Sequence, residues 1–394
     1  MKSEATLKFW ADNAAYGGAT ILAGIFNWLY AVLLAHGMGP ARYGVIITLN
    51  NVVAVITLPA SVVTLASTRR GKPSQRLGFL RLCYGVSGIA LWGLLALSAI
   101  PLSKTLNVAP GLFLLFGLSS WPLIDYAANL GYLARARRYT WLGGLAVTGS
   151  GLSVAAVMGA VMARDGVALL GVLQAMVLWM LWGLSAIAVR GLKVEAAPGS
   201  RSIVLSSGVG MAQSLMMLTD GVIAKARLRP NQAGLYNGLA TVGQTLPFIA
   251  GSLALVMLTA MLDRPVQRAR WFYSALAIYL SIGVAVELLF WLAPRVVVQW
   301  ALGDRFVSVG HWLALYGLAM LALGLLIILL AEAIAREWWT TLVLALGGLA
   351  VWIGLLVRAP SLAGLVHATA VSLIGLAVLA IGLRMWLIHV EQAT

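Results

Sequence analysis

Charged side chains are scarce in this sequence of 394 residues, of which only 10% are Asp, Glu, Lys or Arg. A soluble globular domain carries about 25% charged residues and about 45–50% apolar ones, whereas 61% of this chain is hydrophobic. No stretch between the apolar runs is long enough to form a sizeable soluble domain. These shortages predict a polytopic membrane protein whose main solvent is lipid.

Cysteine and histidine are also rare. The one cysteine, Cys83, cannot form an internal disulfide, and a single thiol does not make a metal cluster. The four histidines stand singly in separate parts of the chain, without the spacing of a metal site. We therefore expect neither a metal nor a cofactor.

Acidic residues number only 12 against 27 Lys and Arg, which gives a formal net charge of +15. A strong positive charge is typical of nucleic-acid-binding proteins, but there it lies along one face of a folded domain. Here the basic residues form short clusters between apolar runs, for example at 69–76 and 135–138. Such clusters are typical of cytoplasmic loops, so we expect both termini to be cytoplasmic and no nucleic-acid partner.

The apolar runs, bounded by charge, Gly or Pro, predict about twelve transmembrane helices of roughly 20 residues or more each. An even number of spans places both termini on the same side of the membrane. The expected spans are 12–36, 43–66, 78–101, 109–133, 140–163, 166–189, 202–226, 232–262, 271–293, 307–335, 338–357 and 361–388.

A linker at the middle of the chain separates two halves of similar length. Residues 190–201 read RGLKVEAAPGSR, and the Pro-Gly-Ser within them is incompatible with a continuous helix. We therefore expect an N-terminal six-helix lobe at 1–196 and a C-terminal six-helix lobe at 197–394.

Each half contains a similar passage, in which Pro is followed by Gly and Tyr and the next helix closes in Leu-Pro. The passages begin at Pro40 and Pro230, and this separation of almost half the chain indicates two parallel repeats. Each of these prolines is expected to start a helix, where its missing N–H costs nothing. Pro59 and Pro247 are expected to bend their helices.

The same passages resemble a known family. MGPARYG (Met38–Gly44) and LMMLTDGVIAKARLRPNQAGLYNGL (Leu215–Leu239) resemble the Wzx oligosaccharide flippases. These belong to the multidrug/oligosaccharidyl-lipid/polysaccharide (MOP) exporter superfamily, together with MurJ and the MATE exporters. The resemblance covers most of the chain and implies an all-α fold of twelve helices in two lobes around a central cavity.

The resemblance also implies a cargo and a location. The cargo would be undecaprenyl-pyrophosphate-linked oligosaccharide, carried across the bacterial cell inner membrane for polysaccharide or O-antigen (lipopolysaccharide) biosynthesis. Polymerase and ligase proteins would be possible partners. The chain is shorter than many relatives and lacks the two extra helices of MurJ, which disfavours a peptidoglycan precursor as cargo.

Such a cargo needs cations for its pyrophosphate and hydrogen-bonding groups for its sugars. Lys225 and Arg227 are the candidate pyrophosphate ligands, although Lys225 could instead extend to the membrane interface. The candidate sugar ligands are amides within expected spans, which could instead form ordinary interhelical hydrogen bonds. These amides are Asn27, Asn50, Asn51, Asn237 and Gln244.

Carboxyl groups within expected spans are the candidates for ion coupling or gating, because such residues usually face a bundle interior or a watery cavity. Asp220 could couple a cation, Asp125 could form an intracellular gate and Glu287 could carry a proton. Structural alternatives stay open for all three, including neutralisation of the arginines after Asp125. Glu332 is expected to form a helix-surface pair with Arg336 one helical turn away.

Two other function classes share this hydrophobic composition. A polytopic glycosyltransferase or acyltransferase needs an active site, and the short expected loops contain no paired carboxylates and no Ser/His/Asp set. We therefore expect no enzyme activity. A MATE-like small-molecule or drug exporter remains the alternative, distinguished by an acidic or apolar pocket. Since no P-loop occurs, we expect a proton or sodium gradient as the energy source.

Overall fold

The computed structural model is all-helical and describes residues 2–68, 77–136, 138–163, 165–192, 201–263 and 265–393. The basic cluster at 69–76, Arg137 and most of the expected linker, 193–200, lie outside the described residues. The chain forms two compact units. Unit 1 comprises Met1–Met38 and Leu49–Ile203, and unit 2 comprises Gly39–Thr48 and Val204–Thr394.

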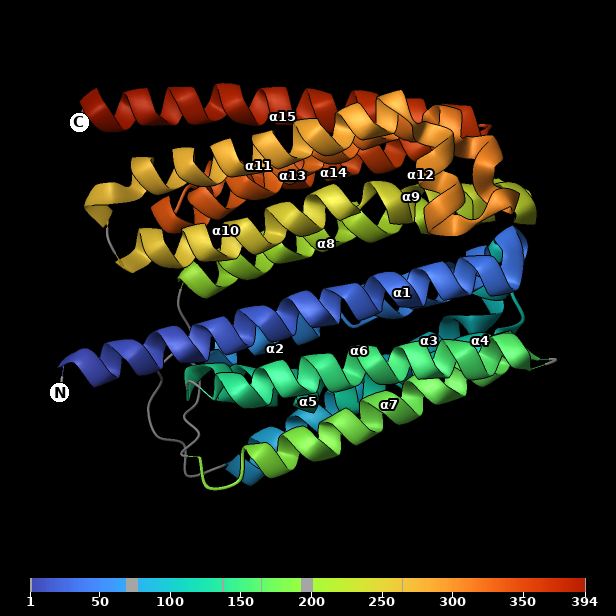
Figure 1. Ribbon diagram of the computed structural model, residues 1–394, viewed down its shortest axis with the longest axis horizontal. Coiled ribbons are helices and arrows are strands. Elements are labelled where there is room, and N and C mark those ends of the chain that lie inside the picture. Colours follow the sequence, from blue (N-terminus) through green and yellow to red (C-terminus); the bar gives the residue numbers. More distant parts are fainter. Residues whose placement is uncertain are drawn as a thin grey trace. The chain divides into compact units, whose positions relative to one another are not determined.

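Unit 1 is a bundle whose helices run roughly lengthwise beside one another (Figure 1). The short helix α5 is central, because it packs against α2, α3 and α7, while α6 packs against α7. The helices that contribute to unit 1 are α1 (Lys2–Ile56), α2 (Pro59–Thr68), α3 (Leu77–Leu106), α4 (Pro110–Gly117), α5 (Ser120–Arg135), α6 (Tyr139–Met162) and α7 (Gly166–Ala188).

Unit 2 is organised around α13, which packs against α10, α11 and α15. In the most apolar 18 residues of Asp304–Arg336, the segment that contains α13, 72% of the residues are buried. Helix α13 is therefore the core helix of this bundle. The elements of unit 2 after the α1 segment are α8 (Arg201–Arg227), α9 (Pro230–Gly243), α10 (Thr245–Asp263), η1 (Pro265–Gln267), α11 (Arg268–Leu292), α12 (Pro294–Leu302), η2 (Asp304–Trp312), α13 (Leu313–Arg336), α14 (Trp339–Arg358) and α15 (Leu362–Ala393).

Ten segments of the described chain are long and apolar enough to cross a membrane. The first, Gly18–Ile56, contains most of two expected spans. Both lie within α1, which consists of two helices joined at a kink at Gly39. The expected seventh span, α8, is not among the ten and is more polar, since it contains Gln213, Asp220 and Lys225. The expected order of spans is otherwise reproduced, with α12 as an additional short helix.

Helices begin or are interrupted at or beside the four prolines that the sequence singles out. Gly39 has φ of 69° and ψ of 170°, a conformation that favours glycine, and the helix restarts at Pro40. Pro230 opens α9. The helix is interrupted just before Pro59, where α2 begins, and again at Gln244, between α9 and α10, so that Pro247 lies in the first turn of α10. Helix boundaries therefore fall beside both prolines, because a proline cannot continue the hydrogen bonds of the preceding turn; a bend at each stays a prediction.

The two repeated passages meet within unit 2. Gly44 and Gly234 lie so close that a Cβ on Gly44 would be 2.7 Å from the Cα of Gly234, and a Cβ on Gly234 would overlap the carbonyl oxygen of Pro40. The Tyr43 hydroxyl shares a hydrogen bond of 2.6 Å with the Thr241 hydroxyl. The short segment Gly39–Thr48 is thereby held against α9.

Candidate functional site

Two side-chain amides and a tyrosine meet in unit 1. The Tyr30 hydroxyl oxygen accepts an N–H from Nδ2 of Asn50 at 3.2 Å and another from Nε2 of Gln174 at 2.7 Å. These residues come from two parts of α1 and from α7, so the bonds connect segments that are distant in sequence. Both amides are held in one orientation, and each retains a carbonyl oxygen that can accept a further hydrogen bond.

A cavity of about 430 Å³ adjoins this cluster. Asn50 and Gln174 line it, and Asn27 adds an exposed amide from α1. The complete lining is Ala23, Asn27, Asn50, Ser119, Tyr126, Leu145, Ala146, Gly149, Ser150, Ser153, Gln174, Val177, Leu178 and Leu181.

Three serine hydroxyls add to the polar lining of this cavity. Ser119, Ser150 and Ser153 each donate to a backbone carbonyl three or four residues earlier, at 2.7, 2.7 and 2.9 Å. Each oxygen still has lone pairs that can accept from a ligand. None of the described residues that line the cavity is charged. Its chemistry therefore suits an uncharged molecule with many hydroxyl groups.

Unit 2 contains a buried carboxylate surrounded by hydrogen-bond donors. Asp220 is only 1% exposed. Its Oδ2 accepts from the hydroxyls of Tyr316 at 2.6 Å and Tyr236 at 3.2 Å, and its Oδ1 accepts from the backbone N–H of Gly221 at 2.7 Å. The Tyr236 hydroxyl is also 3.3 Å from the Thr369 hydroxyl. The cluster thereby connects α8, α9, α13 and α15.

The predicted cargo ligands of unit 2 have different surroundings. Lys225 is 4% exposed, whereas Arg227, at the end of α8, is exposed. The Gln244 amide donates to the backbone oxygen of Met217 at 2.6 Å, which is an interhelical hydrogen bond. Asn237 is 1% exposed, and neither its Oδ1 nor its Nδ2 has a hydrogen-bond partner. An unsatisfied buried amide is costly, which distinguishes Asn237 from Gln244.

The other two predicted carboxyl groups are separate from the Asp220 cluster. In unit 1, Asp125 accepts from Nε1 of Trp182 at 2.7 Å, and its buried Oδ1 has no partner. In unit 2, the half-buried Glu287 packs against Gly317, and its Oε2 is buried without a hydrogen bond. Within the described ranges, no three His, Cys, Asp or Glu side chains are grouped so that they could hold a metal ion.

Sequence reasoning missed the tyrosines of both clusters and the glutamine of α7. Gln174 is the one amide of its apolar helix, and that signal could have identified it. Tyr30, Tyr236 and Tyr316 give no such signal, because a tyrosine in an apolar span is also an ordinary packing residue. Asn51, predicted with Asn50, is half-buried and does not line the cavity.

A charge network ties α13 to α15. Glu332 pairs with Arg336 at 3.0 Å, which confirms the predicted pair, and with Arg384 at 2.6 Å. The predicted surface location was wrong, because Glu332 is fully buried where α13 packs against α15. Arg336 also bonds Glu391 at 2.7 Å. The guanidinium of Arg384 lies 3.8 Å from the ring centre of Phe272, a cation–π contact. This network is structural, since both oxygens of Glu332 already have cationic partners.

No family model matches the chain, and no curated protein matches its sequence. Solved structures do match. An inward-facing MATE family multidrug resistance transporter of the MOP superfamily aligns with a TM-score of 0.72 and 14% identity, over 94% of this chain and 96% of that one. The lipid II flippase MurJ, in an inward closed conformation, aligns with a TM-score of 0.71 and 14% identity, over 94% and 87% of the two chains.

A third similar structure is a MOP superfamily transporter from Pyrococcus furiosus, described as having a binding pocket of reverse polarity. It aligns with a TM-score of 0.56 and 15% identity, over 94% of this chain and 92% of that one. The chain therefore has the fold of MOP superfamily transporters, and the predicted fold class, an all-helical polytopic membrane protein of the MATE and MurJ type, is confirmed.

Proposed function

We propose that this chain is a flippase that carries a polyprenyl-pyrophosphate-linked oligosaccharide across the membrane. The observation that carries the proposal is the uncharged cavity of unit 1, lined by the amides of Asn27, Asn50 and Gln174 and by serine hydroxyls. Amides and hydroxyls match the alternating donors and acceptors of a sugar. The fold supports the proposal, because the similar solved structures include a lipid II flippase as well as multidrug transporters.

The remaining parts of the cargo have candidate ligands in unit 2. Lys225 is buried on α8 and would contribute a positive charge to the pyrophosphate, as would the exposed Arg227 at the helix end. Asn237 would give the cargo a buried amide that is otherwise unsatisfied. The membrane lipid itself would surround the polyprenyl tail.

Ion coupling is assigned to the buried carboxylates. Asp220 bonds to tyrosines of α9 and α13, and Tyr236 connects it to Thr369 of α15. A proton or sodium ion that changed the charge of Asp220 would therefore alter bonds that connect four helices of unit 2. Glu287 and Asp125 each have a buried oxygen without a partner and are the secondary candidates. Alternating access would follow from rocking of the two units.

The alternative, a MATE-like exporter of organic cations, fits the cavity less well. A cationic drug is recognised by a mostly apolar or an acidic pocket, and the unit 1 cavity carries three amides and three serine hydroxyls. The described lining of the unit 1 cavity contains no carboxylate, and both oxygens of Asp220 already accept hydrogen bonds from protein groups. These features favour a sugar cargo.

Complementation tests the proposal. The gene is deleted in its host, and wild type, Gln174→Leu or Gln299→Leu is supplied back; Gln299 is an exposed glutamine of unit 2 and serves as the matched control. We expect loss of surface glycan and internal accumulation of lipid-linked oligosaccharide in the deletion, rescue by wild type and by Gln299→Leu, and poor rescue by Gln174→Leu at equal membrane levels. Unchanged glycan in the deletion strain would refute the proposal.

A further inference from the structure

An apolar groove of about 220 Å³ lies on the surface of unit 2, along the core helix α13. Helix α13 packs against both α11 and α15, so it forms the floor of the groove and the other two helices form its sides. The lining residues are Leu280 on α11, Leu318, Leu321, Ala322 and Leu325 on α13, and Ile374, Ala377, Val378 and Ile381 on α15.

The floor of the groove is a stripe of α13 that its neighbours leave uncovered. Leu318 is 42% exposed, and Leu321, Ala322 and Leu325 are partly exposed, whereas most of α13 is buried. These four positions recur at intervals of three or four residues, so they lie along one face of the helix. Ala322 on the floor and Ala377 on the side add little volume, which keeps the groove open.

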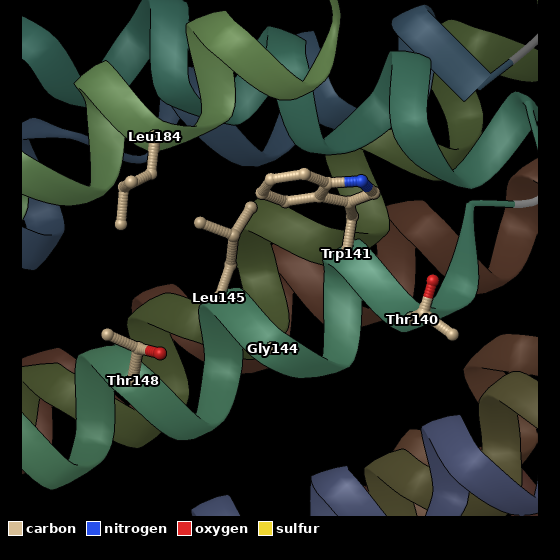
Figure 2. Close-up of a pocket in the computed structure, with 6 residues that line it drawn as sticks. All are labelled: Thr140, Trp141, Gly144, Leu145, Thr148 and Leu184. Carbon is tan, nitrogen blue, oxygen red and sulfur yellow. The ribbon is translucent and has the colours of Figure 1, made fainter.

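A hollow beside Trp141 on α6 of unit 1 shows the contrast in lining (Figure 2). The hydroxyls of Thr140 and Thr148 lie at its ends, together with the indole of Trp141. The groove of unit 2 has only aliphatic side chains among the lining residues that the structure describes. Neither a sugar nor an ion finds a hydrogen bond there, so the groove suits a hydrocarbon chain, held by dispersion contacts.

The groove leads to the point where α11 and α15 meet. Arg384 follows Ile381 by one helical turn, and its guanidinium lies 3.8 Å from the ring centre of Phe272 and 5.4 Å from that of Tyr273. Tyr273 precedes Leu280 by seven residues, so both lie on the same face of α11. One end of the groove is therefore close to the first turns of α11.

Two arginines at the start of α11 have no carboxylate partner. Arg384 is paired with Glu332, whereas Arg268 and Arg270 form no ion pair with a residue that the structure describes. The Nε of Arg268 is buried without a hydrogen-bond partner, and Arg270 is exposed. Guanidinium groups bind phosphate strongly, and the positive end of the α11 dipole adds to the attraction.

The spacing between these arginines and the groove matches one leaflet of a bilayer. Arg270 and Leu280 are ten residues apart, which is about 15 Å along a helix. Half of the hydrocarbon core of a bilayer is also about 15 Å thick. A lipid whose phosphate contacts Arg270 therefore has its acyl chains at the depth of the groove.

We propose that unit 2 binds one anionic phospholipid, with its phosphate at Arg268 and Arg270 and one acyl chain in the groove between α11 and α15. Basic sites beside transmembrane helices are typical of anionic headgroup binding. The floor from Leu318 to Leu325 spans only about 10 Å, which suits an acyl chain better than a long polyprenyl chain. Binding at this site does not depend on which cargo the protein carries.

Lipid titrations of the full-length purified chain in detergent, measured by native mass spectrometry, test the headgroup. The two lipids are phosphatidylglycerol, which is anionic, and phosphatidylcholine with the same acyl chains, which is zwitterionic. We expect the first phosphatidylglycerol to bind about tenfold more tightly, because each arginine near the headgroup favours the anionic lipid. Arg268→Gln combined with Arg270→Gln should remove this preference. The control Arg295→Gln, an exposed arginine beyond the other end of α11, should retain it.

A pair of alanine variants tests the acyl chain. Ala322→Phe places a ring in the groove and should remove most of the binding of both lipids. The control Ala285→Phe changes an exposed alanine of α11 that does not line the groove, and it should bind as wild type does. Equal melting temperatures of the two variants in detergent without added lipid show that both are folded. The arginine variants test the proposal independently of this pair.

Four results would overturn the proposal. The first is equal affinity of wild type for the two lipids, and the second is an unchanged preference in the double arginine variant. The third is lipid binding by Ala322→Phe that equals that of Ala285→Phe, since the groove would then hold no acyl chain. The fourth is a different occupant: polyprenyl pyrophosphate that displaces phosphatidylglycerol from wild type, or a dimer in light scattering that Ala322→Phe separates.

Discussion

The hydroxyl of Tyr316 donates to a buried carboxylate, and removing it should be costly. A hydrogen bond to a charged group contributes about 1.5–3 kcal/mol to stability, and the bond to Asp220 is short at 2.6 Å. We therefore expect Tyr316→Phe to lower the free energy of unfolding by about 2 kcal/mol. Tyr236→Phe should cost less, because its bond to Asp220 is longer, at 3.2 Å.

A matched control isolates the effect of charge. Tyr279 is equally buried, and its hydroxyl donates to a neutral acceptor, the backbone oxygen of Leu321, at 2.9 Å. Neutral interhelical hydrogen bonds in membranes contribute about 0.6 kcal/mol on average. Tyr279→Phe should therefore be the milder change, by more than 1 kcal/mol by the same principles.

The assay is denaturant unfolding in mixed micelles, combined with a double-mutant cycle. In an Asp220→Asn background the carboxylate is absent, so Tyr316→Phe should lose most of its effect, with a coupling energy of about 1–2 kcal/mol. If Tyr316→Phe costs no more than Tyr279→Phe, or if the coupling is zero, Asp220 is not a charged centre held by its neighbours. The reasoning that assigns it to ion coupling would then be wrong.

Three other changes have expected outcomes. Gly234→Ala should sharply reduce the yield of folded protein, because the added methyl would overlap the backbone carbonyl of Pro40. The control Gly251→Ala, whose methyl meets nothing within 4 Å, should express normally. Gel filtration measures the yield of both variants. Glu332→Ala should destabilise by about 3 kcal/mol, because the mostly buried Arg384 loses its carboxylate partner and Arg336 keeps only Glu391. Glu391→Ala, at a more exposed position, should cost under about 1 kcal/mol; equal unfolding midpoints would contradict this. Asn237→Leu should raise the melting temperature and lower transport, and unchanged transport would exclude a ligand role.

The fold was predictable from the sequence because its signals are local. Apolar runs predict the ten described segments that are apolar enough to cross a membrane, and Pro59 and Pro247 lie where the helix is interrupted. The exception is α12, Pro294–Leu302, whose nine residues are too few to produce the apolar run of a transmembrane helix.

The candidate sites were only partly predictable, because their contacts connect distant residues. Asn27 and Asn50 were selected as polar residues within apolar spans, and both line the unit 1 cavity. The partner of Asn50, Tyr30, lies on another part of the same helix, and Gln174 lies on a helix much later in the chain. Spacing rules identify partners three or four residues away, so Glu332 and Arg336 were found as a pair and the tyrosines around Asp220 were not.

The central claim is tested most directly by transport in proteoliposomes that contain only the purified chain. A fluorescent polyprenyl-pyrophosphate oligosaccharide is placed in one leaflet, a proton or sodium gradient is imposed, and the fraction that reaches the opposite leaflet is measured, with an organic cation tested in parallel. We predict gradient-dependent transfer of the oligosaccharide lipid, abolished by Asp220→Asn, and no transport of the cation. Transport of the cation without transfer of the lipid would contradict the account and favour a drug exporter.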